Sequence, residues 1–231
     1  GYYKIGIRGR QDQMRGMYSN RRLYVNGEVP CLEANQIKFY YDTDWSITTP
    51  KPENGDDLYF YLQAGTNTIS LEAVPGEICE IMGDLDELVY NINSYYRQIR
   101  QITGPDPDEY NNYMIDTAIP SIVPDFKEYA QTLRDKKAEI EKLSGSGGTE
   151  AETLEKMAIV LDKCIKKPDL IPEMMSQIKD NITSVSSFVN QYREQPLEVD
   201  MIEVATSDQD FTSCDKSFFG SLGFGFKGFI G

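Results

Sequence analysis

Five residues that lie close together in the sequence could bind a sugar. Tyr40, Tyr41 and Trp45 supply aromatic rings, and Asp42 and Asp44 supply carboxylates. An aromatic ring can stack on the apolar face of a pyranose, while a few polar groups fix its hydroxyls. Trp45 is the single tryptophan of the chain. We take these residues as a candidate glycan site. The alternative is that Trp45 covers the core of a β-sheet domain.

The composition excludes several kinds of catalysis. The 231 residues include no histidine, which excludes Ser-His-Asp and Cys-His catalysis and metal sites that need His ligands. The acid pairs Asp56-Asp57 and Asp84-Asp86 are too close in sequence to face one substrate atom as a glycosidase pair does. We therefore expect no enzyme. Four dispersed cysteines without a CxxC pair predict buried or isolated thiols, with disulfides as the alternative: Cys31, Cys79, Cys164 and Cys214.

The charge of the chain also limits its partners. The formal net charge is −14. Because phosphate contacts need a basic face, this charge argues against binding nucleic acid. No apolar run of 18 residues predicts a transmembrane segment. The one basic cluster lies near the N-terminus, and we expect Arg21 and Arg22 in particular to contact another domain. An anionic sugar and solvated charge are the alternatives.

Residues 1–75 have the pattern of a β-sheet domain. Short runs of alternating or β-branched and aromatic residues predict about five strands, and Asn26-Gly27 is a strong hairpin signal. Residues 42–57 read as a loop that is rich in acids. Strands at such short spacing favour a sandwich or barrel. The predicted strands are Tyr3–Ile7, Leu23–Val25, Ile37–Tyr41, Leu58–Leu62 and Thr68–Ala73.

After Pro75-Gly76 the pattern becomes helical. Apolar residues recur every three or four positions, as on one face of a helix. We expect four helices, over about 78–102, 119–143, 149–165 and 172–192, with a Ser/Gly-rich break between the second and third. Short connections between helices of this length predict a roughly antiparallel bundle.

The β pattern returns at Leu197–Val204, where apolar and acidic residues alternate. A single strand after a helical block needs a sheet to pair with. The economical solution is the sheet that begins before the block. We therefore expect an α+β chain in which residues 1–75 and 196–206 form an antiparallel β-sandwich and residues 76–195 form a helical-bundle insertion.

Three stretches resemble galactose-binding-like β-sandwich modules. Gly65–Leu71 resembles one of their strands, Arg22–Gly27 resembles the preceding strand and turn, and Leu197–Val204 resembles their last strand. The resemblance implies a jelly-roll-like sandwich whose N-terminal strands are missing here. An acid in the last strand of such modules often helps to hold a structural calcium ion, which implies this role for Asp200. The alternation by itself implies a solvent-facing acid, and otherwise we expect no cofactor.

A narrower resemblance concerns Tyr24–Pro30, the region around Trp45 and Arg193–Leu197. These resemble large bacterial extracellular solute-binding proteins of sugar ABC transporters, in which a sandwich with a helical insertion lies beside the solute-binding lobes. Most of residues 2–205 are covered, and the bilobal solute-binding fold itself is absent. The aromatic and Gly-rich residues 207–231 are then expected to form a linker or tail toward a missing domain. A membrane-touching or low-complexity segment is the alternative.

This resemblance implies a non-catalytic accessory module of an extracellular carbohydrate-uptake protein on the surface of a bacterium. It would bind an oligo- or polysaccharide weakly, or position the solute-binding domain. The implied partners are neighbouring domains of the same chain and the ABC permease. The alternative is a purely structural protein–protein interaction module that uses the surface of the helical bundle.

Overall fold

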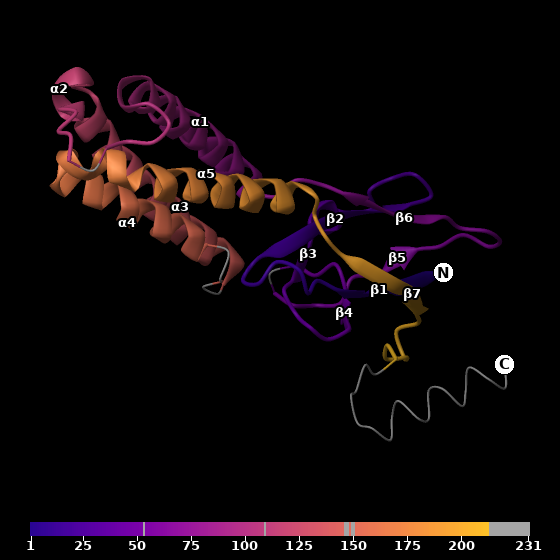
Figure 1. Cartoon of the computed structure of the whole chain (residues 1–231). Coiled ribbons are helices and arrows are strands. Elements are labelled where there is room, and N and C mark those ends of the chain that lie inside the picture. The colour runs from indigo at the N-terminus through magenta and orange to yellow at the C-terminus, as the bar shows by residue number, and fades with distance from the viewer. Residues whose placement is uncertain (53, 109, 146–147, 149–150, 213–231) are drawn as a thin grey trace. The chain divides into compact units, whose positions relative to one another are not determined.

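The computed structural model describes residues 1–52, 54–108, 110–145, 148 and 151–212 (Figure 1). Most of the predicted tail, residues 213–231, lies outside the described residues. The chain divides into two compact units. We call residues 1–12, 21–72 and 197–212 the sheet unit, and the described residues of 13–20 and 73–196 the helical unit.

The sheet unit contains two sheets. The first is built around β1 (Tyr2–Arg10), which pairs antiparallel with β4 (Ser46–Thr48), β5 (Phe60–Tyr61) and β7 (Glu198–Ala205). The second has the order β3-β2-β6. Its strands are β3 (Ile37–Tyr40), β2 (Tyr18–Val25) and β6 (Ile69–Ala73), and a short 3-10 helix, η1 (Leu32–Asn35), precedes β3.

The strand that follows the helices returns to the first strand of the chain. The pairing of β7 with β1 runs from Lys4 opposite Ala205 to Arg10 opposite Glu198, with an irregularity at Arg8/Gly9. Figure 1 shows the yellow-orange β7 beside the indigo β1. The predicted α+β class with antiparallel sheets and a helical insertion is therefore confirmed.

Alternation along β1 separates the core of the sheet unit from its outer surface. Ile5 and Ile7 are fully buried, whereas Lys4, Arg8 and Arg10 lie at the positions that face the other way. The core that they join is small. It consists of Ile5, Ile7, Leu23, Val25, Ala34, Ile37, Phe39 and Phe60.

The structure corrects one local prediction in the sheet unit and shortens another. The predicted loop 42–57 contains β4, because Ser46–Thr48 pairs with Ile7–Gly9. The predicted strand Leu58–Leu62 is reduced to Phe60–Tyr61, which pairs with Tyr2 and Tyr3. Both differences come from pairing with β1, which local propensity does not encode.

The described part of the helical unit contains four long helices and two short ones. The long helices are α1 (Ile78–Thr103), α3 (Ile122–Ser144), α4 (Glu152–Lys166) and α5 (Ile171–Arg193). The short elements are α2 (Ile115–Ala118) and the 3-10 helix η2 (Pro168–Leu170). The second predicted helix begins later than expected, because the chain first forms α2 and then turns into α3.

Two of the long helices, α1 and α3, end where glycine allows a left-handed or extended turn. Gly104 (φ +77°) follows α1 and its N–H donates to the Arg100 carbonyl. Gly145 (φ +72°) follows α3 and its N–H donates to the Glu141 carbonyl. Positive φ costs a residue with a Cβ more than it costs glycine, so these two positions stop the helices at fixed points.

Residues 13–20 belong to the helical unit although they contain no helix. Met14, Met17 and Tyr18 are buried in the helical core. The Ser19 hydroxyl donates to the Pro196 carbonyl at 2.6 Å, and the Asn20 N–H donates to Gln195 Oε1 at 2.7 Å. The segment is thus fastened to the end of the bundle at which the chain leaves α5.

The bundle has two different ends. The start of α1 and the end of α5 lie together, since Cys79 and Tyr192 line one small pocket. The end of α1 and the start of α5 also lie together, since Tyr96 and Met175 line another. A helix of 26 residues such as α1 spans about 39 Å. We call the second end, which carries the connection 104–114, the free end of the bundle.

No helix among the described residues combines the length and the apolar character that a membrane crossing needs.

Candidate functional site

The five predicted glycan residues occupy different surroundings. Tyr40 ends β3 with 52% of its surface exposed. Tyr41 forms an isolated bridge with Gln11. Asp42 accepts a hydrogen bond from the Asp44 N–H at 3.0 Å, which closes a turn before Trp45. One of the two carboxylates therefore shapes the loop.

The Trp45 ring is in contact with two arginines. The guanidinium carbon of Arg10 lies 5.1 Å from the ring centroid, and that of Arg8 lies 5.6 Å from it. Cation–π contacts of this kind hold an aromatic ring in place. A sugar that stacked on the same face would have to displace the guanidinium groups.

The same arginines are held by acids of β7. Arg8 Nη1 donates to Asp200 at 3.1 Å, and Arg10 Nη2 donates to Glu198 at 2.6 Å. The hydrogen bond to Glu198 raises the pKa of the Arg10 guanidinium. The acids on β7 thus fix the arginines that cover Trp45.

Asp200 therefore has a guanidinium partner. Calcium takes six to eight oxygen ligands. Among the residues that the structure describes, no group of three or more Cys, Asp or Glu side chains is placed to hold a metal ion. The described residues do not fit a calcium site at Asp200, and the ion stays a prediction from the resemblance.

Arg21 and Arg22, the two arginines predicted to contact another domain, differ in their surroundings. Arg22 lies 3.5 Å from Glu72, and its Nη1 donates to the Tyr24 hydroxyl at 3.5 Å. Burial lowers the pKa of the Arg21 guanidinium. Arg22 thus has partners within the sheet unit, and a role between domains stays a prediction for both.

Of the five glycan residues, Tyr40 lines a groove of about 500 Å³ on the sheet unit. Lys38 and Tyr40 lie two positions apart on β3 and so point to the same side of the strand. Ile47 and Thr48 of β4 and the following Thr49 also line this groove.

A buried lysine lies in the same groove. Lys4 is 7% exposed, and its Nζ lies 3.5 Å from an Asp57 carboxylate oxygen. Its Nζ also lies 5.6 Å from the centroid of the Phe211 ring. Lysine is almost never buried unless it is paired. Asp57 and Phe211 therefore account for the position of this ammonium group.

Phe211 reaches the groove because the chain after β7 is tied back to the sheet. The Glu203 carboxylate accepts hydrogen bonds from the Thr212 N–H at 3.0 Å and from its hydroxyl at 3.0 Å. Gly6 makes room for the ring: a Cβ there would lie 2.9 Å from Phe211 and 2.7 Å from Ile47. These contacts build the floor of the groove.

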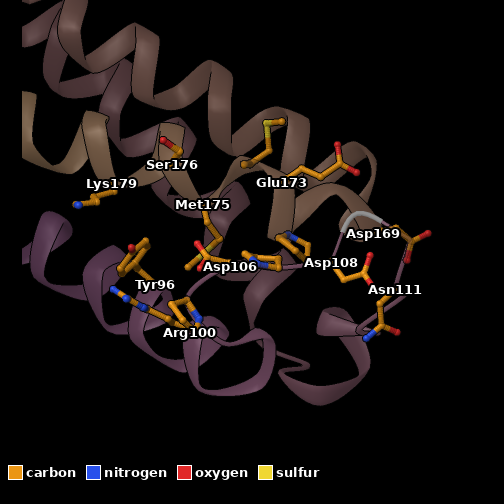
Figure 2. Close-up of a pocket in the computed structure, with 14 residues that line it drawn as sticks. Tyr96, Arg100, Asp106, Asp108, Asn111, Asp169, Glu173, Met175, Ser176 and Lys179 are labelled. Carbon is orange, nitrogen blue, oxygen red and sulfur yellow. The ribbon is translucent and has the colours of Figure 1, made fainter.

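A second hollow of about 630 Å³ lies at the free end of the bundle. Figure 2 shows Tyr96 and Arg100 on α1, Met175 and Lys179 on α5, and Asp106 from the connection after α1. Arg100 and Lys179 are both exposed. Solvated surface charges of this kind contribute little by themselves.

The helical unit decides the family. A family model described as bacterial solute-binding protein, 4-helix bundle domain, matches residues 80–195, half of the chain. The chain belongs to this family. The match covers the 4-helix bundle domain from α1 to α5, including the hollow at its free end, and leaves out the sheet unit. A search of curated proteins and a search of solved structures each returned no match.

Sequence reasoning missed the lysines of the groove. Lys4, Lys38 and Lys51 are far apart in the chain and meet through the pairing of β1 with β4 and the outward face of β3. One sequence feature could have indicated Lys38: in the predicted strand 37–41 it lies two positions from Tyr40, and so on the same face. Phe211 had no such signal.

Proposed function

We propose that the chain is a non-catalytic accessory module of a bacterial solute-binding protein that takes part in carbohydrate uptake. The observation that carries this proposal is the insertion of the 4-helix bundle domain between β6 and β7 of a sheet unit. The sheet unit binds glycan weakly, and the module as a whole positions the solute-binding domain.

The groove at Tyr40 supports the glycan part of the proposal better than Trp45 does. The Tyr40 ring is half exposed beside polar side chains, whereas Trp45 already has two guanidinium groups over its ring. A pyranose needs one accessible ring face and a few hydrogen-bonding groups around it. The groove offers both.

The proposed surroundings follow from the family. The module lies at the bacterial cell surface, next to other domains of the same protein and to the ABC permease. In this arrangement residues 1–75 and 196–206 act as one module, residues 76–195 as its insertion, and residues 207–231 as the link to the next domain.

The test is isothermal calorimetry with a panel of neutral and acidic oligosaccharides. We expect weak, saturable binding that Tyr40→Ala removes. Tyr90→Ala is the matched control, because Tyr90 is also an exposed tyrosine and lies on α1 of the 4-helix bundle domain. Loss of binding in both variants, or in neither, would contradict the assignment of the groove.

A second candidate function is a purely structural interaction module that uses the bundle surface. Large apolar side chains are exposed near its free end: Tyr110 at 96%, Met114 at 55% and Ile102 at 40%. Exposed apolar groups that lie close together often mark a protein contact.

A photo-crosslinking residue at position 110, in cells that make the whole solute-binding protein, tests this candidate. We expect a discrete crosslink to a neighbouring domain or to the permease. The same residue at position 90, also exposed on the bundle, is the control. Equal crosslinking from both positions would argue against a specific surface.

A further inference from the structure

The described residues that line the groove include more lysines than aspartates, in a chain whose net charge is −14. The lysines are Lys4, Lys38 and Lys51, and the aspartates are Asp57 and Asp210. Asp57 pairs with Lys4 at 3.5 Å. A local excess of positive charge on an acidic protein concentrates an anionic ligand at that place.

The groove also has aromatic surface. Tyr40 is half exposed at its rim, and the partly buried Phe211 ring lies at the Lys4 ammonium. Inorganic anions do not need apolar contact. Rings beside ammonium groups fit a ligand with an apolar face and a negative charge.

From these observations we propose that the groove binds a sugar acid, that is, a pyranose ring that carries a carboxylate. The carboxylate lies at Lys38 and Lys51, the ring stacks on Tyr40, and the sugar hydroxyls bond Asp210. A volume of about 500 Å³ has room for one or two sugar rings. This inference rests on the proposed glycan function and names the class of glycan.

The experiment compares an acidic ligand with its neutral methyl ester. Calorimetry measures the affinity of the whole chain for oligogalacturonate and for the same oligosaccharide with its carboxylates methyl-esterified, in the presence of a chelator. We expect the acid to bind about tenfold more tightly than the ester, because a charge-assisted hydrogen bond is lost in the ester. The affinity for the acid falls as salt is added.

Protein variants locate the site. The double variant Lys38→Met, Lys51→Met is expected to lose about tenfold in affinity for the acid and to keep its affinity for the ester. Lys156→Met, at an exposed lysine of α4, removes a charge of the same kind elsewhere and is expected to change neither. Circular dichroism and the emission of Trp45 show that each variant is folded.

Each other outcome overturns a defined part of the account. Equal affinity for acid and ester overturns the charge recognition and leaves the glycan function standing. Acid binding that the lysine double variant does not weaken overturns the placement in this groove. A folded protein that binds no saccharide, neutral or acidic, overturns the glycan function and the inference together.

Discussion

The helical unit and the sheet unit bury their apolar side chains in different ways. The helical core is continuous from Met14 to Tyr192 and takes residues from all four long helices. The sheet unit has a small core and a groove that contains a buried lysine. The difference teaches that the unit with the weaker core carries the groups suited to binding.

The largest expected effect is on the helical core. Phe126→Ala in α3 removes a buried ring that packs edge-on against Tyr95 at 5.5 Å between centroids. We expect it to lower the free energy of unfolding by about 3–5 kcal/mol. Urea unfolding followed by circular dichroism at 222 nm measures the change.

The control for this variant is Tyr90→Ala, where the expected change is within about 0.5 kcal/mol because the ring is exposed. Trp45 lies in the sheet unit, so its emission follows that unit separately. If Phe126→Ala lowered the urea midpoint of the Trp45 emission as much as that of the 222 nm signal, the two units would not unfold independently.

Replacing glycine by alanine is expected to change the stability of the two units in opposite directions. Gly6→Ala in β1 brings a Cβ within 3 Å of Ile47 and Phe211, and we expect it to destabilise the sheet unit by about 1–3 kcal/mol. Gly83→Ala in α1 meets open space and is expected to stabilise the helical unit by about 0.5–1 kcal/mol.

Thermal unfolding of both variants, followed by circular dichroism at 222 nm and by Trp45 emission, measures these two changes in stability. A stabilising Gly6→Ala would show that Phe211 does not pack on β1, and the floor of the groove would then be wrong.

A smaller effect is expected at the polar contact between α1 and α3. The Tyr95 hydroxyl donates to Asp125 and lies 2.6 Å from the Ser121 hydroxyl. Burial raises the pKa of Tyr95, and the hydrogen bond to Asp125 raises it further. Tyr95→Phe is expected to cost about 1 kcal/mol in urea unfolding. An unchanged free energy of unfolding would contradict this, and would mean that water replaces the Tyr95 hydroxyl at no cost.

The smallest effect concerns thiol chemistry. Burial raises the pKa of Cys164 in α4 to about 12, whereas Cys31 and Cys79 are half-buried. The thiolate is the reactive species, so Cys164 is expected to react with a disulfide reagent at pH 8 only after unfolding. Labelling of a Cys214→Ser variant with peptide mapping measures this. Fast native labelling of Cys164 would show that the helical core opens readily.

The sequence predicted the helical unit better than the sheet unit for a physical reason. A helix is set by residues three or four positions apart, so the apolar spacing from Ile78 to Tyr192 placed all four long helices. The short α2 and the segment 13–20 were missed, because they are held by packing on the helices. Met14, Met17 and Tyr18 show no periodic pattern.

Strand pairing depends on residues far apart in the sequence. The alternation in Leu197–Val204 showed that a strand returns. Of the two short strands that pair with β1, β5 lies in a run that predicted a strand, whereas β4 lies in a segment that predicted a loop. The candidate site was the part that the sequence predicted least well. Tyr40 was named for its ring, whereas Lys4 and Phe211 come together only through β1, β7 and the contact of Glu203 with Thr212.

The most direct test of the division between a binding sheet unit and a structural helical unit is hydrogen exchange with and without a saturating oligosaccharide. We predict new protection of backbone amides in β1, in residues 38–51 and in residues 206–212, with none in α1 to α5. Protection that appears in the helices and is absent from the groove would contradict the account, and would place the ligand on the bundle.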